Sequence, residues 1–268
     1  MRRLPSALVA ALLLASGCGE GASVDAGSCE ALFGAPGENT GLDASVCRPE
    51  RICEGAADFV PPDYDGALLA SLRDRTPSEP PQRLAGDPYA DGSLVPVDTS
   101  GVCAVLGGRE GYALETFPSA AEAEAAGGTV THEGACGACS SLQDLAVYLT
   151  YPDLGTPVRE CGLIELGQNP EATLACILDL GFTEPCAQIW LANTLHTREA
   201  CLAPCLEALG EPFHLDDGSL NECLACDEVA SGPVFKAVAG RTRRNSGIPS
   251  AICRPGENVA AIRHDAYP

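Results

Sequence analysis

The sequence lacks the short motifs that identify several common classes of enzyme. It contains no G-x-S-x-G nucleophile elbow, no S-x-x-K pair, no Walker A phosphate loop and no G-x-G-x-x-G dinucleotide fingerprint. Each motif places a nucleophile or a set of backbone amides where its chemistry needs them. The sequence therefore gives no support to the hydrolases, nucleotide hydrolases and dehydrogenases that depend on these motifs.

Long apolar runs and basic residues are also scarce. After residue 18, apolar stretches such as "LACILDLGF" are interrupted within a dozen residues, whereas a spanning helix needs roughly 20. Without Arg2 and Arg3, 14 Lys and Arg residues stand against 37 acidic ones, a net charge of −23. A surface with this much negative charge repels nucleic acid and anionic membranes. We therefore expect neither as a partner.

The few basic residues are concentrated near the C-terminus. From residue 231 onward there are six basic and two acidic residues, so this part carries +4 and residues 18–230 carry −27. Such an asymmetry indicates a partner for the basic segment, either within the chain or outside it.

The N-terminus has the features of an export signal. Arg2 and Arg3 precede an apolar stretch, and Ala15-Ser16-Gly17-Cys18 resembles a bacterial lipobox, in which the cysteine is lipidated. We therefore expect a signal peptide over 1–17 and a lipidated tether over 18–28 that attaches to the membrane through the lipid on Cys18 alone. Because Gly19 and not Asp follows the cysteine, we expect an extracytoplasmic protein of the bacterial outer membrane.

Fifteen cysteines stand out against this background. Without Cys18, an even number remains, and thiols of exported proteins pair into disulfides. Four lie before residue 104 and ten after it, so we expect two separately closed sets of structural disulfides. The cysteines are Cys29, Cys47, Cys53 and Cys103 in the first set, and Cys136, Cys139, Cys161, Cys176, Cys186, Cys201, Cys205, Cys223, Cys226 and Cys253 in the second.

Residues 29–103 are rich in Pro, Gly and Asp and, apart from "GALLASLRD", show little periodicity, so we expect mostly loops there. Residues 104–268 are expected to form a disulfide-braced, mainly helical domain with a small β element. The predicted strands are "YALETF" and "TVTH", with a short helix capped by Ser119 between them. Further helices are expected near residues 141–151, 170–180, 184–195, 198–209 and 222–230, with a last turn at 234–239. Their expected N-caps are Asn169, Thr183, Thr197 and Asn221.

The segment "HEGACGACSS" at residues 132–141 is open to three interpretations. A CxxC pair at a helix start is typical of thiol-disulfide oxidoreductases. Cys136, Cys139, Cys223 and Cys226 could also bind zinc, but their two pairs lie far apart in the chain. In an exported chain this rich in cysteine, structural disulfides are the preferred interpretation. We expect Cys201 and Cys205, four apart on a helix, to bond to a neighbouring helix.

Two groups of polar residues are candidates for a functional site. His132 and Asp144, with Glu184 and the Arg243/Arg244 loop, form the site of an alternative enzyme hypothesis. Arg241, Arg243 and Arg244 near Asp227 could bind a small anionic or protein ligand. The competing interpretations are a structural histidine, and arginines that neutralise Asp227, Glu228 or Glu184. No metal or cofactor is predicted.

Three stretches resemble an uncharacterised family of cysteine-rich secreted proteins of microbial eukaryotes and some bacteria. They are "YALETFPSAAEAEAAGGTVTHEGACGACSSLQDLAVYL", "GFTEPCAQIWLANT" and "NECLACDEVASGPVFKAVAGRTRRNSGIPSAICRP". The resemblance covers about residues 112–256 and implies an exported, disulfide-rich domain without a known activity. On the whole sequence we expect a non-catalytic surface binding or structural module, with the enzyme hypothesis above as the alternative.

Overall fold

The structure is a computed structural model. It describes residues 64–79, 82–108, 110–151, 153–164, 168–211, 213, 220–248, 260–265 and 267. The expected signal peptide and tether, Cys18, and the expected disulfide cysteines Cys29, Cys47, Cys53 and Cys253 lie outside these residues. Within them, no helix is long and apolar enough to cross a membrane.

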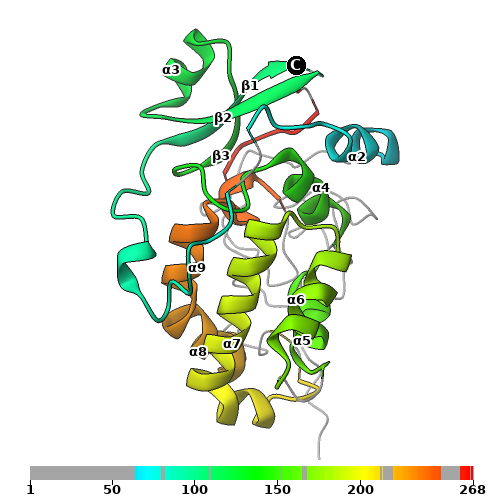
Figure 1. The fold of residues 1–268 in the computed structure, drawn as a ribbon, viewed down its shortest axis with the longest axis vertical. Helices are drawn as coiled ribbons and strands as arrows, with labels where there is room; N and C mark the ends of the chain where they lie inside the picture. The colour runs from blue at the N-terminus through cyan, green and yellow to red at the C-terminus, as the bar shows by residue number, and fades with distance from the viewer. Residues whose placement is uncertain are drawn as a thin grey trace, which may run out of the picture.

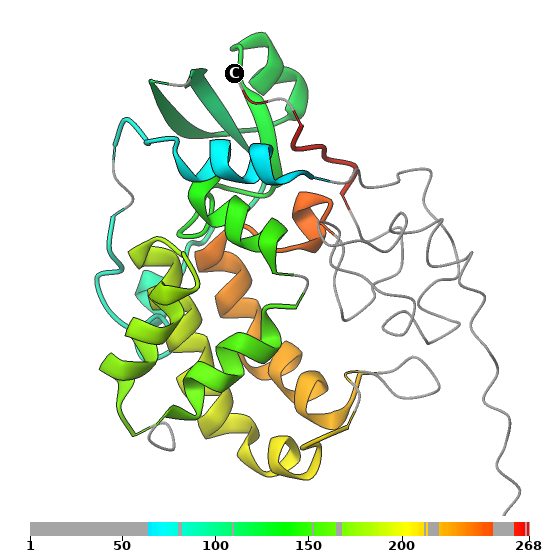
Figure 2. The same ribbon diagram turned by 90° about the vertical axis from the view of Figure 1, so that its right-hand side faces the viewer.

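The fold is mainly α with a small β element, as the sequence predicts. A three-stranded sheet and α3 lie at one end of the molecule, and α5 to α9 form a bundle at the other (Figures 1 and 2). The elements are α2 (Gly66–Arg73), η2 (Gly92–Leu94), β1 (Val102–Gly108), β2 (Gly111–Phe117), α3 (Ala120–Ala125), β3 (Thr129–Glu133), α4 (Leu142–Thr150), α5 (Gly155–Gly162), α6 (Pro170–Asp179), α7 (Glu184–Glu207), α8 (Glu222–Ala230), α9 (Gly232–Ala239) and η4 (Arg244–Ser246).

The sheet has the antiparallel order β2-β1-β3. Its central strand, β1, is absent from the sequence prediction, because Cys103, Ala104 and Val105 are all buried and produce no alternating pattern. The expected division of the chain after residue 103 falls inside this strand. In β3, Thr131 is an extra residue between the pairs Cys103–His132 and Ala104–Val130, which makes it a β-bulge.

Two helices that the prediction does not contain complete the fold. Helix α2 lies within the segment expected to be mostly loops; Asp65 caps its first turn, and Leu69 and Leu72 are buried in the same core as α4. Helix α5 lies between α4 and α6 and buries Val158 and Cys161. Helix α5 is only eight residues long and shows little periodicity in the sequence, whereas α2 coincides with "GALLASLRD", the one stretch of its segment with periodicity.

The capping predictions are confirmed at three of the expected helix starts. The side chains of Ser119, Asn169 and Asn221 accept hydrogen bonds from backbone N–H groups in the first turns of α3, α6 and α8. Thr183 stands at the N-cap of α7 without a side-chain cap bond, since its hydroxyl donates to Asp144.

The prediction of two helices over 184–195 and 198–209 misplaces the point where they part. Element α7 consists of two helical segments that meet at a kink, and Thr197 lies inside the first of them with its hydroxyl bonded to Asp227 instead of capping a new helix. The irregularity lies later, at Cys201, where φ is −124° and ψ is 16°. Pro204 explains its position, because proline has no N–H to donate to the carbonyl of Ala200, four residues earlier.

Five disulfides brace the described residues: Cys103–Cys136, Cys139–Cys186, Cys161–Cys176, Cys201–Cys226 and Cys205–Cys223. The last two confirm that the paired cysteines of α7 bond to a neighbouring helix, α8. The expectation of two separately closed sets is wrong, because the first bond joins β1 to the turn after β3. That pairing follows from the strand register, which sets Cys103 opposite His132 near the end of β3.

Candidate functional site

The segment "HEGACGACSS" forms the corner between β3 and α4. Cys136 bonds to Cys103 on β1, and Cys139 bonds to Cys186 on α7. The two cysteines of the CxxC motif therefore belong to different disulfides, and Cys139 is completely buried. The geometry is that of a structural corner fixed to two neighbours, not of a dithiol that opens and closes.

The same corner caps the C-terminus of α9. The N–H groups of Ala138 and Cys139 donate to the carbonyls of Val238 and Ala239, both at 2.9 Å. A Cβ atom on Gly137 would lie 2.5 Å from the Val238 carbonyl oxygen, so only glycine fits this contact. Gly240 follows α9 with φ of 69° and packs against Gly137 backbone to backbone.

Arg241 comes next in the chain and is completely buried. Its guanidinium group makes five hydrogen bonds, and every acceptor is neutral. Nε donates to the Cys139 carbonyl, Nη1 to the Thr131 carbonyl and the Ser246 hydroxyl, and Nη2 to the Thr131 hydroxyl and the Ser140 carbonyl, at 2.6–3.1 Å. These bonds use all five guanidinium N–H groups, so none remains for an external anion.

The bulge in β3 provides two of these acceptors. An extra residue turns its backbone and side chain out of the regular ladder. The carbonyl and the hydroxyl of Thr131 both accept hydrogen bonds from the Arg241 guanidinium group. Arg241 thus joins β3, the corner and the loop after α9.

His132 lies in the same buried region. Its Nδ1 is 2.8 Å from the Glu133 carbonyl oxygen and its Nε2 is 2.7 Å from the Ser140 hydroxyl. Because a carbonyl oxygen only accepts, Nδ1 carries the proton and Nε2 accepts from Ser140. Burial, with the charge of Arg241, lowers the pKa of His132 to about 3. The ring is a neutral structural histidine with both nitrogens bonded.

Asp144 is buried at the start of α4. Its carboxylate accepts from the Ser141 hydroxyl and from both the backbone N–H and the hydroxyl of Thr183. Burial raises the pKa of Asp144 to about 6, although these hydrogen bonds favour the charged form. Asp144 therefore joins the start of α4 to the start of α7.

The remaining candidates of the enzyme hypothesis do not join His132 and Asp144 in an open site. Glu184 forms an ion pair with the exposed Arg83 on the surface. Arg243 donates to the carbonyls of Tyr148 and Tyr151 at 2.6 and 2.7 Å, and Arg244 is half-buried in the 3-10 turn η4. Burial lowers the pKa of Arg243 to about 10.

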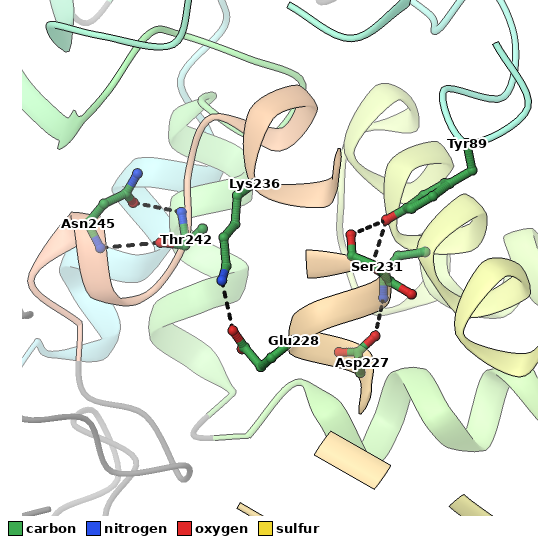
Figure 3. Close-up of polar contacts among 8 residues, drawn as sticks. Tyr89, Asp227, Glu228, Ser231, Lys236, Thr242 and Asn245 are labelled. Atoms are coloured by element: carbon green, nitrogen blue, oxygen red, sulfur yellow. Dashed lines mark hydrogen bonds and ion pairs between the residues drawn. The ribbon is translucent and has the colours of Figure 1, made fainter. Parts of the chain in front are cut away.

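The acids named as partners of these arginines pair with other groups. The hydrogen bonds of Arg241 and Arg243 described above run to carbonyls and hydroxyls, while the charge of Arg241 acts on the nearby carboxylate of Asp144. Of the acids expected as partners, Glu228 pairs with Lys236, as Figure 3 shows, and Glu184 pairs with Arg83.

Asp227 belongs to a different polar cluster, between α7, α8 and the start of α9. Its carboxylate accepts from Thr197, whose hydroxyl is 2.8 Å from that of Ser231. The Ser231 hydroxyl lies 2.9 Å from Nδ1 of His196, and burial raises the pKa of Asp227.

Tyr89, in the segment that precedes β1, packs against this polar cluster and bonds to it. Its ring stacks on His196 with centroids 4.3 Å apart. Its hydroxyl lies 2.8 Å from the carbonyl oxygen of Ser231 (Figure 3) and 2.8 Å from Oδ1 of Asn193. The cluster fastens residues 82–99 to the helical bundle.

Sequence reasoning missed the residues that complete the Arg241 region. His264 Nε2 donates to the Ser246 carbonyl at 2.7 Å, and its Nδ1 is 2.7 Å from the Tyr267 hydroxyl, which is 2.9 Å from the Thr131 hydroxyl. Burial lowers the pKa of His264 to about 3. No local pattern marks these residues, because their partners are far away in the sequence.

Comparison with known proteins finds a match to one family model over part of the chain. Residues 170–262 match the model of a family of unknown function (DUF8771). This match overlaps the stretch that resembles an uncharacterised family. Neither the search of curated proteins nor that of solved structures found a match. Within the described ranges, no group of three or more His, Cys, Asp or Glu side chains is arranged to hold a metal ion.

The first prediction concerns Arg241. Arg241→Met removes five donors and leaves buried carbonyls at Thr131, Cys139 and Ser140 without them, so we expect a loss of roughly 3–5 kcal/mol in the free energy of unfolding. Arg263→Met is the matched control, since Arg263 forms an exposed ion pair with Asp265, and its loss should change stability by less than about 0.5 kcal/mol. Denaturant titration followed by circular dichroism measures both. Equal stability of the two variants would contradict the structural role of Arg241.

The second prediction concerns pH. The imidazoles of His132 and His264 have a pKa of about 3 in the folded protein and about 6.5 in the unfolded chain. Below pH 6.5 the unfolded chain therefore binds more protons than the folded protein. The free energy of unfolding then falls by about 1.4 kcal/mol per pH unit for each histidine. Asp144, whose pKa is raised to about 6, takes up its proton first in the folded state and offsets part of the loss between pH 6 and 4. Denaturant titrations from pH 7.5 to 4.5, with NMR of the imidazole nitrogens, test this. Titration of either ring near pH 6.5 in the folded protein would refute it.

Proposed function

We propose that the chain is an exported, lipid-anchored module that displays a rigid, non-catalytic binding or structural surface outside the cytoplasm. The burial of the candidate site residues supports the proposal that the module is non-catalytic. The side chains of His132, Asp144 and Arg241 are fully buried and form their hydrogen bonds with other groups of the protein. A catalytic imidazole or carboxylate needs an atom that reaches a substrate. These groups offer none.

Two features support export. Five disulfides within the described residues are the usual device of proteins in oxidising compartments. The segment Ala15–Cys18 supplies a lipobox-like site of attachment, and "GEGASVDAGS" after it provides a small, polar spacer. We place the anchored protein in the bacterial outer membrane because Gly19 follows the cysteine.

The alternative functions have weaker support. The oxidoreductase hypothesis needs Cys136 and Cys139 as one exchangeable pair, whereas each is bonded to a different strand or helix. The zinc hypothesis needs thiolates at Cys223 and Cys226, and both are in disulfides. An anion site on Arg241 would have to displace its internal hydrogen bonds, which use all five of its N–H groups.

The third prediction tests the anchor. In a diderm bacterial host, the wild-type chain should fractionate with the outer membrane, and mass spectrometry should find a lipid on Cys18. Cys18→Ala should release the protein into the soluble periplasmic fraction, because it removes the attachment atom. Gly19→Asp is the matched control: it leaves the cysteine in place and should retain the lipid but shift the protein to the inner membrane. Wild-type protein that is soluble and carries no lipid would refute the anchor.

A further inference from the structure

Three leucines remain exposed at the end of the molecule that lies farthest from the sheet. Leu202 and Leu206 lie one turn apart on the last part of α7, and Leu209 lies in the turn that ends the helix. Their exposed fractions are 51%, 57% and 59%. The spacing of four puts Leu202 and Leu206 on one side of α7, and Leu209 follows in the turn after the helix ends; we call these three residues the leucine stripe. Grouped exposed apolar side chains of this kind mark sites of interaction.

The stripe is held rigidly. Cys201 and Cys205, in the same turns of α7, bond to Cys226 and Cys223 of α8. Ala208, between Leu206 and Leu209, is buried. This end of α7 is therefore fixed to α8 (Figure 2), and its leucines are displayed outward from a braced helix. A surface that is already ordered loses little conformational entropy when a partner binds.

Charge restricts what this surface can bind. Exposed Glu199, Glu207 and Glu211 flank the leucine stripe, and the exposed Arg198, one turn before Leu202, is the one basic residue of 198–211, so this stretch carries −2. Residues 18–230 carry a net charge of −27. A second copy of this chain would bring the same acidic surface against it, and an anionic lipid surface would be repelled. Opposite charge favours a basic partner.

We propose that the leucine stripe docks an amphipathic, basic segment of another protein, as a helix that lays its apolar face on Leu202, Leu206 and Leu209 and its Lys or Arg residues beside the flanking glutamates. This inference deepens the proposed function, because it names the surface and the chemistry of the partner of a non-catalytic module. Apolar contact supplies the affinity, and the glutamates select the basic partner and set its orientation.

The probe is a fluorescein-labelled, helix-forming peptide with Leu at positions i, i+3, i+4 and i+7 and Lys on its flanks. The protein is the full oxidised chain made soluble by Cys18→Ala, and binding is measured by fluorescence anisotropy. We expect the probe to bind at least tenfold more tightly than a scrambled peptide of the same composition. The double variant Leu202→Ser/Leu206→Ser should lose at least tenfold in affinity, and Glu199→Gln/Glu207→Gln should weaken binding at low salt and remove much of its salt dependence.

Val97→Ser is the matched control, because Val97 is fully exposed but lies outside the stripe, after η2, and it should bind as the parent does. Thermal unfolding checks that each variant keeps its fold. Equal binding of the scrambled peptide, or unchanged binding by the leucine variant, would overturn the proposal. So would a dimer of the parent that the leucine variant loses, or binding of the parent to phosphatidylglycerol vesicles through these leucines. Each of these results leaves the Cys18 fractionation unaffected, so the two proposals fail independently.

Discussion

The fold depends on one buried cation, the guanidinium group of Arg241. A charge of this kind is costly to remove from water unless every donor finds a partner. Here the partners are carbonyls and hydroxyls of Thr131, Cys139, Ser140 and Ser246, which belong to three separate parts of the chain. The requirement to satisfy this one side chain therefore fixes how β3, the corner before α4 and the loop after α9 meet.

The disulfides and glycines reinforce the same junction. Cys136 and Cys139 bond the corner to β1 and α7, while Gly137 and Gly240 allow its backbone to touch the end of α9. The C-terminal residues His264 and Tyr267 then cover the Arg241 region from the far end of the chain. Residues with the chemistry of a catalytic centre are thus gathered in one place, but as an enclosed hydrogen-bonded network. We expect function to lie on the exposed surface of the braced helices instead.

Local signals in the sequence predicted much of this structure. Helix caps at Ser119, Asn169 and Asn221 are visible because a polar side chain precedes an apolar run, and the cysteine pair of α7 is readable from its spacing. Strand β1 gives no alternating signal, because Cys103, Ala104 and Val105 are buried in succession. The sequence also does not show the role of Arg241, because four of its five acceptors, three of them backbone carbonyls, lie about a hundred residues earlier. A cluster of arginines in an acidic chain suggests that they bind carboxylates or an external anion. In the structure, the guanidinium N–H groups of Arg241 instead bond mostly to backbone carbonyls that the fold brings close.

The most direct test is whether the imidazoles of this network are closed to solvent. Diethylpyrocarbonate modifies accessible neutral histidines, and mass spectrometry of peptides locates each modified residue. The account predicts that His132 and His264 stay unmodified in the native protein and react once the reduced chain is unfolded in denaturant. Modification of His132 in the native protein, at the rate of the unfolded chain, would contradict it and restore His132 as a candidate for catalysis.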